Sequence, residues 1–271
     1  MPILNKDMTL CISLSGRPSN IGTRFHNYLY EELGLNFIYK AFSTEDLAGA
    51  IAGVRALGIR GCSVSMPFKE DVMAMVDEIE PSAKAIDSVN TIVNTNGRLV
   101  ASNTDFEAIA TLIERHKLDP GSSVLVRGSG GMAKAVVAAF REAGFRDLTV
   151  LARNEGSGQA LADKYGYGFV GVDPAPGHNI LVNVTPLGMD GAQSEELSFS
   201  AQQIGLARSV FDVVAFPSET PLIRVARSAG KQVITGAEVI ALQAAAQFEK
   251  YTGQAPTEEQ VIRASEFSRE S

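Results

Sequence analysis

Three polar residues in the first half of the chain have the types needed to move a proton at an alcohol: Lys69, Asn90 and Asp105. Each is expected near a strand end or in the turn after it, where ligands of α/β proteins bind. A lysine whose pKa is lowered by burial can take a hydroxyl proton while hydride leaves the same carbon. A carboxylate would orient the lysine, and an amide would fix a neighbouring hydroxyl. The segment SVSMPFKEDV around Lys69 also suits a solvated helix start, since most lysines are exposed.

A second constellation is a glycine-rich turn between an apolar run and an alanine-rich run, in SVLVRGSGGMAKAVVAAF. It fits G-x-G-x-x-A in the strand–turn–helix context that dinucleotide binding requires. Gly128 would allow the tight turn, Gly130 the close approach of a pyrophosphate, and Ala133 close packing of helix on sheet. The phosphate would lie at the helix N-terminus, where free N–H groups favour negative charge. The alternative is a glycine-rich turn that binds nothing.

The end of the next expected strand indicates which dinucleotide binds. An NAD site usually has an acid there for the ribose 2′-hydroxyl, whereas this chain reads Ala152-Arg153-Asn154, with no acid before Glu155. An arginine can pair with a 2′-phosphate, so the sequence favours NADP over NAD. Arg153 could instead stack on adenine or face water.

Short β-like runs alternate with helical patterns, which predicts an α/β fold with largely parallel sheets. The expected strands of the first part are 9–14, 37–42 and 59–65, followed by a hairpin of 88–94 and 98–103 around Asn96-Gly97. Its expected helices are 23–34, closed by Gly34, and 44–58, opened by Thr44. After a helix over 105–122, the expected strands are 123–128, 148–153, 179–185, 209–216 and 231–236. The helices between and after them are 131–144, 157–166, 220–230 and 237–253, the last apolar on most faces and expected to be buried.

Composition excludes several classes of protein. The chain has 271 residues, enough for two domains, and 45% of them are hydrophobic. The formal net charge of -7 and the lack of a Lys/Arg cluster argue against nucleic-acid or anionic-membrane partners. With no apolar run of about twenty residues and no signal-peptide pattern, the expected location is the cytoplasm. Cys11 and Cys62 are expected to be buried and reduced, and His26 to be a packed or capping histidine.

Taken together, the motifs resemble the shikimate dehydrogenase family, and within it the shikimate dehydrogenase-like branch. GCSVSMPFKE resembles the family's G-x-N-V-T-x-P-x-K motif, SVNTIV matches A-V-N-T, and SNTD matches N-T-D. GSGGMAKA matches the nucleotide turn, ARN stands at the family's Asn-Arg-Thr, and LVNVTPLGM resembles N-x-T-x-x-G-M. The matches run in the family's order over nearly the whole chain.

The resemblance implies an α/β enzyme that interconverts shikimate and 3-dehydroshikimate with NADP and without a metal. Its N-terminal substrate domain would comprise residues 1–105 and 238–271, with the C-terminal helix returning to it, and a Rossmann domain would comprise 106–237. The implied catalytic residues are Lys69 and Asp105, and the substrate-binding residues are Asn90, Gln243, Ser65, Ser19 and Thr23. The implied cofactor-binding residues are Gly128, Ser129, Gly130, Gly131, Met132, Ala133, Arg153, Asn154, Asn183, Thr185 and Gly236.

Departures from the family pattern concern the groups that would read the substrate. The Ser-x-Ser pair that holds the substrate carboxylate is missing from GRPSNIGTRFHN, where Ser19, Asn20 or Thr23 could substitute and Arg17 or Arg24 could supply charge. Serines stand at positions 63 and 65 for the motif's Asn and Thr, and Ala215 stands for an active-site tyrosine. Quinate or an amino-substituted shikimate is therefore an alternative substrate. A nucleotide- or metabolite-sensing module without turnover is another alternative, and both a monomer and a homodimer remain open.

Overall fold

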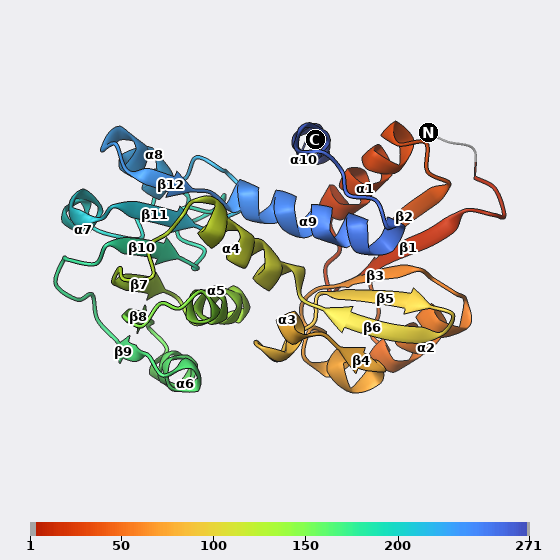
Figure 1. The fold of residues 1–271 in the computed structure, drawn as a ribbon, viewed down its shortest axis with the longest axis horizontal. Helices are drawn as coiled ribbons and strands as arrows, with labels where there is room; N and C mark the ends of the chain where they lie inside the picture. The colour runs from red at the N-terminus through yellow and green to blue at the C-terminus, as the bar shows by residue number, and fades with distance from the viewer. Residues whose placement is uncertain (1–3, 270–271) are drawn as a thin grey trace. The chain divides into compact units, whose positions relative to one another are not determined.

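The computed structural model describes residues 4–269 and divides into two units (Figure 1). The first unit is Met1–Thr104 with Ala241–Ser271, and the second is Asp105–Ile240. The chain passes from the first unit to the second at the start of helix α4 (Thr104–Arg115), and it returns within α9 (Gly236–Thr252). The return of the C-terminal segment to the first unit is the arrangement that the sequence predicts.

The first unit is built on a mixed sheet with the strand order β2-β1-β3-β5-β6-β4. The strands are β1 (Thr9–Leu14), β2 (Phe37–Phe42), β3 (Gly61–Val64), β4 (Glu78–Ile79), β5 (Thr91–Thr95) and β6 (Arg98–Ser102). β1 pairs in parallel with β2 and β3, whereas β5 is antiparallel to both β3 and β6. The hairpin prediction is confirmed, because Asn96 and Gly97 have φ values of 52° and 87° in the turn between β5 and β6.

Helices cover both faces of this sheet. On one face α2 (Leu47–Ala56) and the 3-10 turn η1 (Asp71–Met75) pack on the apolar side chains of β1 and β3. On the other face α1 (Asn20–Glu32), the second half of α9 and α10 (Glu258–Arg269) share a core rich in aromatic rings. Cys62 belongs to the first core and Cys11 to the second; both are buried and free, as predicted. Burial raises the pKa of the Cys11 thiol to about 11, so the group is an inert apolar side chain.

The second unit contains an all-parallel sheet with the order β12-β11-β10-β7-β8-β9. Its strands are β7 (Val124–Arg127), β8 (Leu148–Leu151), β9 (Gly168–Val170), β10 (Ile180–Asn183), β11 (Ser209–Asp212) and β12 (Gln232–Ile234). Its helices besides α4 are α5 (Gly131–Glu142), α6 (Glu155–Tyr165), α7 (Ala201–Leu206) and α8 (Pro221–Ser228). This is the doubly wound Rossmann order, and its direction reverses between β7 and β10, where nucleotides bind. The predicted Rossmann architecture is confirmed.

Some predicted details are wrong or incomplete. The second helix does not open at Thr44: α2 begins at Leu47, and the Asp46 carboxylate caps it by accepting from the Gly49 N–H at 2.8 Å. Between residues 4 and 269, six elements lie outside the predicted set: η1, α3 (Pro81–Lys84), β4, β9, α7 and α10. Except for α10, these elements are six residues long or shorter, so their sequences are too short to show a hydrophobic periodicity. Most residues of α9 are half-buried, so it is less enclosed than its composition suggests.

Candidate active site

The carboxyl ends of β1 and β3 carry two adjacent loops in the first unit. The Ser65 N–H donates to the Leu14 carbonyl at 2.9 Å, and the Gly16 N–H donates to the Met66 carbonyl at 3.0 Å. A side chain at Gly16 would press on the ring of Pro67, with its Cβ 3.2 Å from Cδ. The loop after β1 is therefore fixed against the loop that carries the predicted catalytic lysine.

Lys69 lies at the end of a turn that begins with the cis Met66–Pro67 peptide. The Phe68 N–H closes this turn on the Ser65 carbonyl at 3.0 Å, and the Val89 N–H donates to the Lys69 carbonyl at 2.8 Å. The Lys69 side chain is half-buried. The backbone of Lys69 is thus held beside the segment that leads into Asn90.

The Asn90 amide is the centre of a buried hydrogen-bond cluster. Its Oδ1 accepts from the Thr104 N–H at 2.8 Å and from the Thr91 hydroxyl at 2.7 Å, and its Nδ2 donates to Thr104 Oγ1 at 3.0 Å. Thr104 Oγ1 also lies 3.4 Å from Gln243 Oε1. The first residue of α4 is therefore tied to Asn90 and Gln243, and Asp105, 9% exposed, is the next residue along the chain.

A second buried cluster, which the sequence motifs do not predict, adjoins this one through Thr91 and is centred on Gln247. Its Nε2 donates to Thr91 Oγ1 at 3.0 Å, and its Oε1 accepts from Ser63 Oγ at 3.3 Å. The Ser63 hydroxyl lies 2.5 Å from the Tyr39 hydroxyl, so the serine that replaces the family's asparagine is engaged inside the unit. The available signal was the spacing of Gln247, which stands one helical turn after Gln243 on α9.

His26 packs against the same cluster, as the sequence predicts. Its ring stacks on that of Tyr39 with 4.4 Å between centroids, and it is 1% exposed. Burial lowers the pKa of His26 to about 3, while a hydrogen bond with Gln247 acts in the opposite direction. His26 is therefore neutral at physiological pH and serves packing.

The segment that replaces the family's serine pair offers few accessible hydroxyls. Ser19 is exposed at the start of α1, and its side chain does not cap the helix. Thr23 Oγ1 is closed to solvent and has no hydrogen-bond partner among the described residues. Ser65 is exposed at the end of β3.

The glycine-rich turn between β7 and α5 has the conformation that its sequence requires. Gly128 has a φ of 122°, and a Cβ there would lie 2.8 Å from Val184 Cγ2, so only glycine fits. A Cβ at Gly130 or Gly131 would instead meet no described atom within 4 Å outside the adjacent residues and the backbone of the helix itself. This open space at the N-terminus of α5 suits the close approach of a pyrophosphate. Ala133 is fully buried where the helix packs on the sheet.

Around this turn, Ser129 Oγ lies 2.7 Å from Ser157 Oγ, near the start of α6. Asn154 caps α6, accepting from the Ser157 N–H at 3.0 Å. The exposed Arg153 has no hydrogen bond or ion pair with any residue from 4 to 269. Its guanidinium is therefore available to an anionic group.

The loop after β10 is shaped by a buried carboxylate. Asp212 Oδ1 accepts from Asn183 Nδ2 at 3.0 Å and from the Val214 N–H at 3.1 Å, and Oδ2 accepts from the Thr220 hydroxyl at 2.6 Å. Asn183 Oδ1 in turn accepts from the Thr185 hydroxyl at 2.6 Å, so both of these predicted cofactor residues are fixed by the network. Any side chain at Gly236 would overlap the backbone of Val214.

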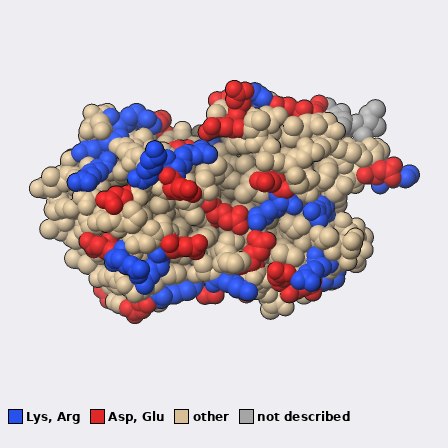
Figure 2. Space-filling model, in the orientation of Figure 1, with Lys and Arg blue, Asp and Glu red and all other residues tan. Residues whose placement is uncertain are grey.

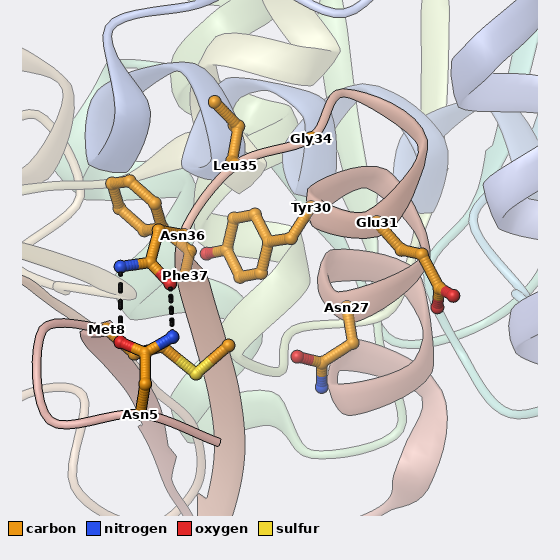
Figure 3. A pocket seen from close by; sticks show the side chains of 9 residues that line it. All are labelled: Asn5, Met8, Asn27, Tyr30, Glu31, Gly34, Leu35, Asn36 and Phe37. Atoms are coloured by element: carbon orange, nitrogen blue, oxygen red, sulfur yellow. Dashed lines mark hydrogen bonds between the residues drawn. The ribbon is translucent and has the colours of Figure 1, made fainter. Parts of the chain in front are cut away.

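A cavity of about 290 Å³ lies at the amino ends of β1 and β2, away from these loops (Figure 3). The Asn5 and Asn36 amides on its wall bond to each other at 3.0 Å. No predicted site residue lines it.

On the face drawn in Figure 2, Lys and Arg side chains alternate with Asp and Glu. Within residues 4–269, no helix is long and apolar enough to cross a membrane, and no group of three His, Cys, Asp or Glu side chains could hold a metal ion.

The buried carboxylate predicts a pH-dependent stability. Burial raises the pKa of Asp212 from 3.8 to about 6, so the ionised form destabilises the folded protein. The contribution of the protonated Asp212 to the stability of the folded protein is fully present below pH 4 and is lost as the pH rises through 6. We expect Asp212→Asn to match wild type near pH 4 and to exceed it by up to about 3 kcal/mol in free energy of unfolding at pH 7. Urea unfolding across this range measures the difference, and a constant difference would contradict the assignment.

Comparison with known proteins identifies the family of the chain. The family model for the shikimate dehydrogenase substrate binding domain matches residues 20–92. A shikimate dehydrogenase-like protein of Haemophilus influenzae is 59% identical over 268 residues, covering 98% of this chain and 99% of that protein. An NADP(+) shikimate dehydrogenase of Pyrococcus abyssi is 34% identical over 258 residues, covering 93% of this chain and 96% of that protein.

Solved structures extend the likeness to the fold. A shikimate 5-dehydrogenase-like protein superposes with a TM-score of 0.97 at 58% identity, covering 99% of this chain and 100% of the other. The shikimate 5-dehydrogenase of Thermus thermophilus, in complex with NADP(H) and shikimate, superposes with a TM-score of 0.85 at 29% identity, covering 96% and 100%. A quinate dehydrogenase of Corynebacterium glutamicum in complex with NAD superposes with a TM-score of 0.86 at 26% identity, covering 96% of this chain and 98% of the other. The sequence matches and the shared fold lead to one conclusion: the chain belongs to the shikimate dehydrogenase family, in its shikimate dehydrogenase-like branch.

Proposed function

We propose that this protein interconverts shikimate, or a close analogue, and 3-dehydroshikimate, with NADP as the hydride carrier. Its family relatives make it an NADP-dependent oxidoreductase that acts on CH–OH groups. The observation that carries the proposal is the bonding of Asn90 to Thr104 at 2.8 and 3.0 Å, next to the loop of Lys69. It fixes the residue before Asp105 at the strand ends where ligands of α/β proteins bind.

In the proposed reaction, Lys69 Nζ takes the proton of the substrate hydroxyl as the carbon–hydrogen bond breaks and a carbonyl forms. Asp105 accepts a hydrogen bond from that hydroxyl group or from the lysine and keeps the two aligned. The Asn90 amide and the Gln243 amide hold neighbouring hydroxyl groups, with Ser65 at the edge of the same site. NADP, when bound, accepts the hydride in oxidation and, in its reduced form, supplies it in reduction.

The residues of the second unit fit the dinucleotide. The open space beside Gly130 and Gly131 suits the pyrophosphate, and the N–H groups at the start of α5, which no N-cap side chain bonds, suit its negative charge. Arg153 supplies the positive charge for the 2′-phosphate. The remaining cofactor-binding residues that we propose are Gly128, Ser129, Met132, Ala133, Asn154, Asn183, Thr185 and Gly236.

A related ring acid such as quinate, or an amino-substituted shikimate, is the second candidate substrate. Two departures favour it: the missing serine pair, and Ala215 in place of a tyrosine, which leaves a hydroxyl out of the pocket. Relative turnover of shikimate and quinate separates the two candidates.

The catalytic assignment predicts that Lys69→Ala and Asp105→Ala each lower turnover of shikimate with NADP by about a hundredfold or more, because proton transfer and its alignment are lost. Absorbance of the reduced nicotinamide measures the rate, and fluorescence titration should show NADP binding within about twofold of wild type. Lys84→Ala, which removes an exposed lysine of α3, is the control and should keep full turnover. Nucleotide binding by wild type without turnover of shikimate or quinate would refute the enzymatic role.

The cofactor assignment predicts that Arg153→Ala weakens NADP binding by about tenfold or more, because a charge-assisted pairing with the 2′-phosphate is removed. NAD, which lacks that phosphate, should bind within about twofold of wild type. Arg146→Ala removes an exposed arginine ahead of β8 and serves as the matched control. Equal loss of NADP and NAD affinity would show that Arg153 stacks on adenine instead.

A further inference from the structure

The family's carboxylate-holding serine pair has no counterpart in this chain, yet the proposed substrates carry a carboxylate. We propose that Arg17 binds this carboxylate and makes the site selective for a ring acid over its neutral derivatives. The inference rests on the proposed function and names the residue that recognises the substrate's charged end.

The loop of Arg17 is rigidly placed at the strand ends. The Ser15 N–H donates to the Phe42 carbonyl at 3.2 Å, and the Ser15 hydroxyl accepts from the Arg17 N–H at 3.0 Å. The residue between them, Gly16, bonds to the Met66 carbonyl at 3.0 Å. The backbone of Arg17 is therefore held one residue away from the contact between Gly16 and the turn that leads to Lys69.

The guanidinium of Arg17 is exposed and makes no hydrogen bond or ion pair within the described part of the chain. Arg24, the other cation of this segment, is engaged elsewhere. Its Nε donates to the Phe267 carbonyl at 3.1 Å, and its guanidinium lies 4.6 Å from the centre of the Phe267 ring. Helix α10 thus holds one arginine and leaves the other available.

Ser19 and Ser65 are exposed, but each offers a single hydroxyl, and other polar groups nearby are already engaged or enclosed. Thr23 Oγ1 is enclosed, and Ser63 Oγ is bonded to Tyr39 and Gln247. The ammonium of Lys40 lies 4.8 Å from the ring centre of Phe42. A guanidinium can replace the two serine hydroxyls as a hydrogen-bond donor, since its parallel N–H groups bind both oxygens of a carboxylate.

The test compares a charged ligand with its neutral counterpart in calorimetric titrations: shikimate and shikimate methyl ester. Arg17→Ala should weaken shikimate binding by about tenfold or more and ester binding by about twofold or less. Arg17→Lys, which keeps the charge without the planar fork, should fall between wild type and Arg17→Ala with shikimate. Arg24→Ala should bind both ligands as wild type does.

Wild-type affinity for shikimate in Arg17→Ala, equal losses for shikimate and ester, or no binding of either ligand by wild type would each overturn the assignment. Turnover is measured separately. Arg17-dependent shikimate binding without any turnover would refute the proposed function and leave the assignment of Arg17 standing.

Discussion

The hydrogen bonding of the Asn90 amide is the interaction on which the substrate half of this protein depends. Asn90 is 3% exposed, and an amide buried without partners would be strongly unfavourable. Its bonds to Thr91 and Thr104 satisfy its oxygen and one of its two N–H groups and, in doing so, join the start of β5 to the start of α4. Gln243 and Gln247 extend the cluster to α9, so the C-terminal segment supplies part of it. The hydrogen bonds of this buried cluster therefore fix the positions of β5, the start of α4 and α9 relative to one another.

The nucleotide half relies on backbone shape rather than on a side-chain cluster facing the ligand. Gly128 is required by its φ of 122° and by its contact with Val184, whereas Gly130 and Gly131 leave space. Several polar side chains of this unit form hydrogen bonds within the protein: Asp212 and Asn183 fix the loop after β10, and Asn154 caps α6. Backbone N–H groups at the start of α5 can bind a phosphate without any side chain, so a site of this kind needs only the correct backbone conformation.

The sequence predicts the parts of the fold that are encoded locally. Asn96-Gly97 demands a tight turn, and the glycine-rich turn demands a strand before it and a helix after it, and both are found. The order of the strands in each sheet and the position of α10 against α1 depend on contacts between residues far apart in sequence, and local sequence patterns do not predict such contacts. The same limit applies to the site, since Tyr39, Ser63 and Gln247 lie far apart in sequence and their bonding becomes visible only in the folded unit. The family motifs supplied Lys69 and Asp105, but their roles remain predictions.

Replacement of Thr104 tests whether the Asn90 cluster positions the catalytic groups, because this fully buried residue links Asn90 to the start of α4. Thr104→Ser keeps the hydroxyl, and Thr104→Val keeps the shape without it. We expect the serine variant to retain kcat for shikimate with NADP, whereas the valine variant should lose about tenfold or more in kcat with unchanged NADP affinity. Equal kcat in both variants and wild type would contradict the claim that this buried cluster positions the catalytic groups.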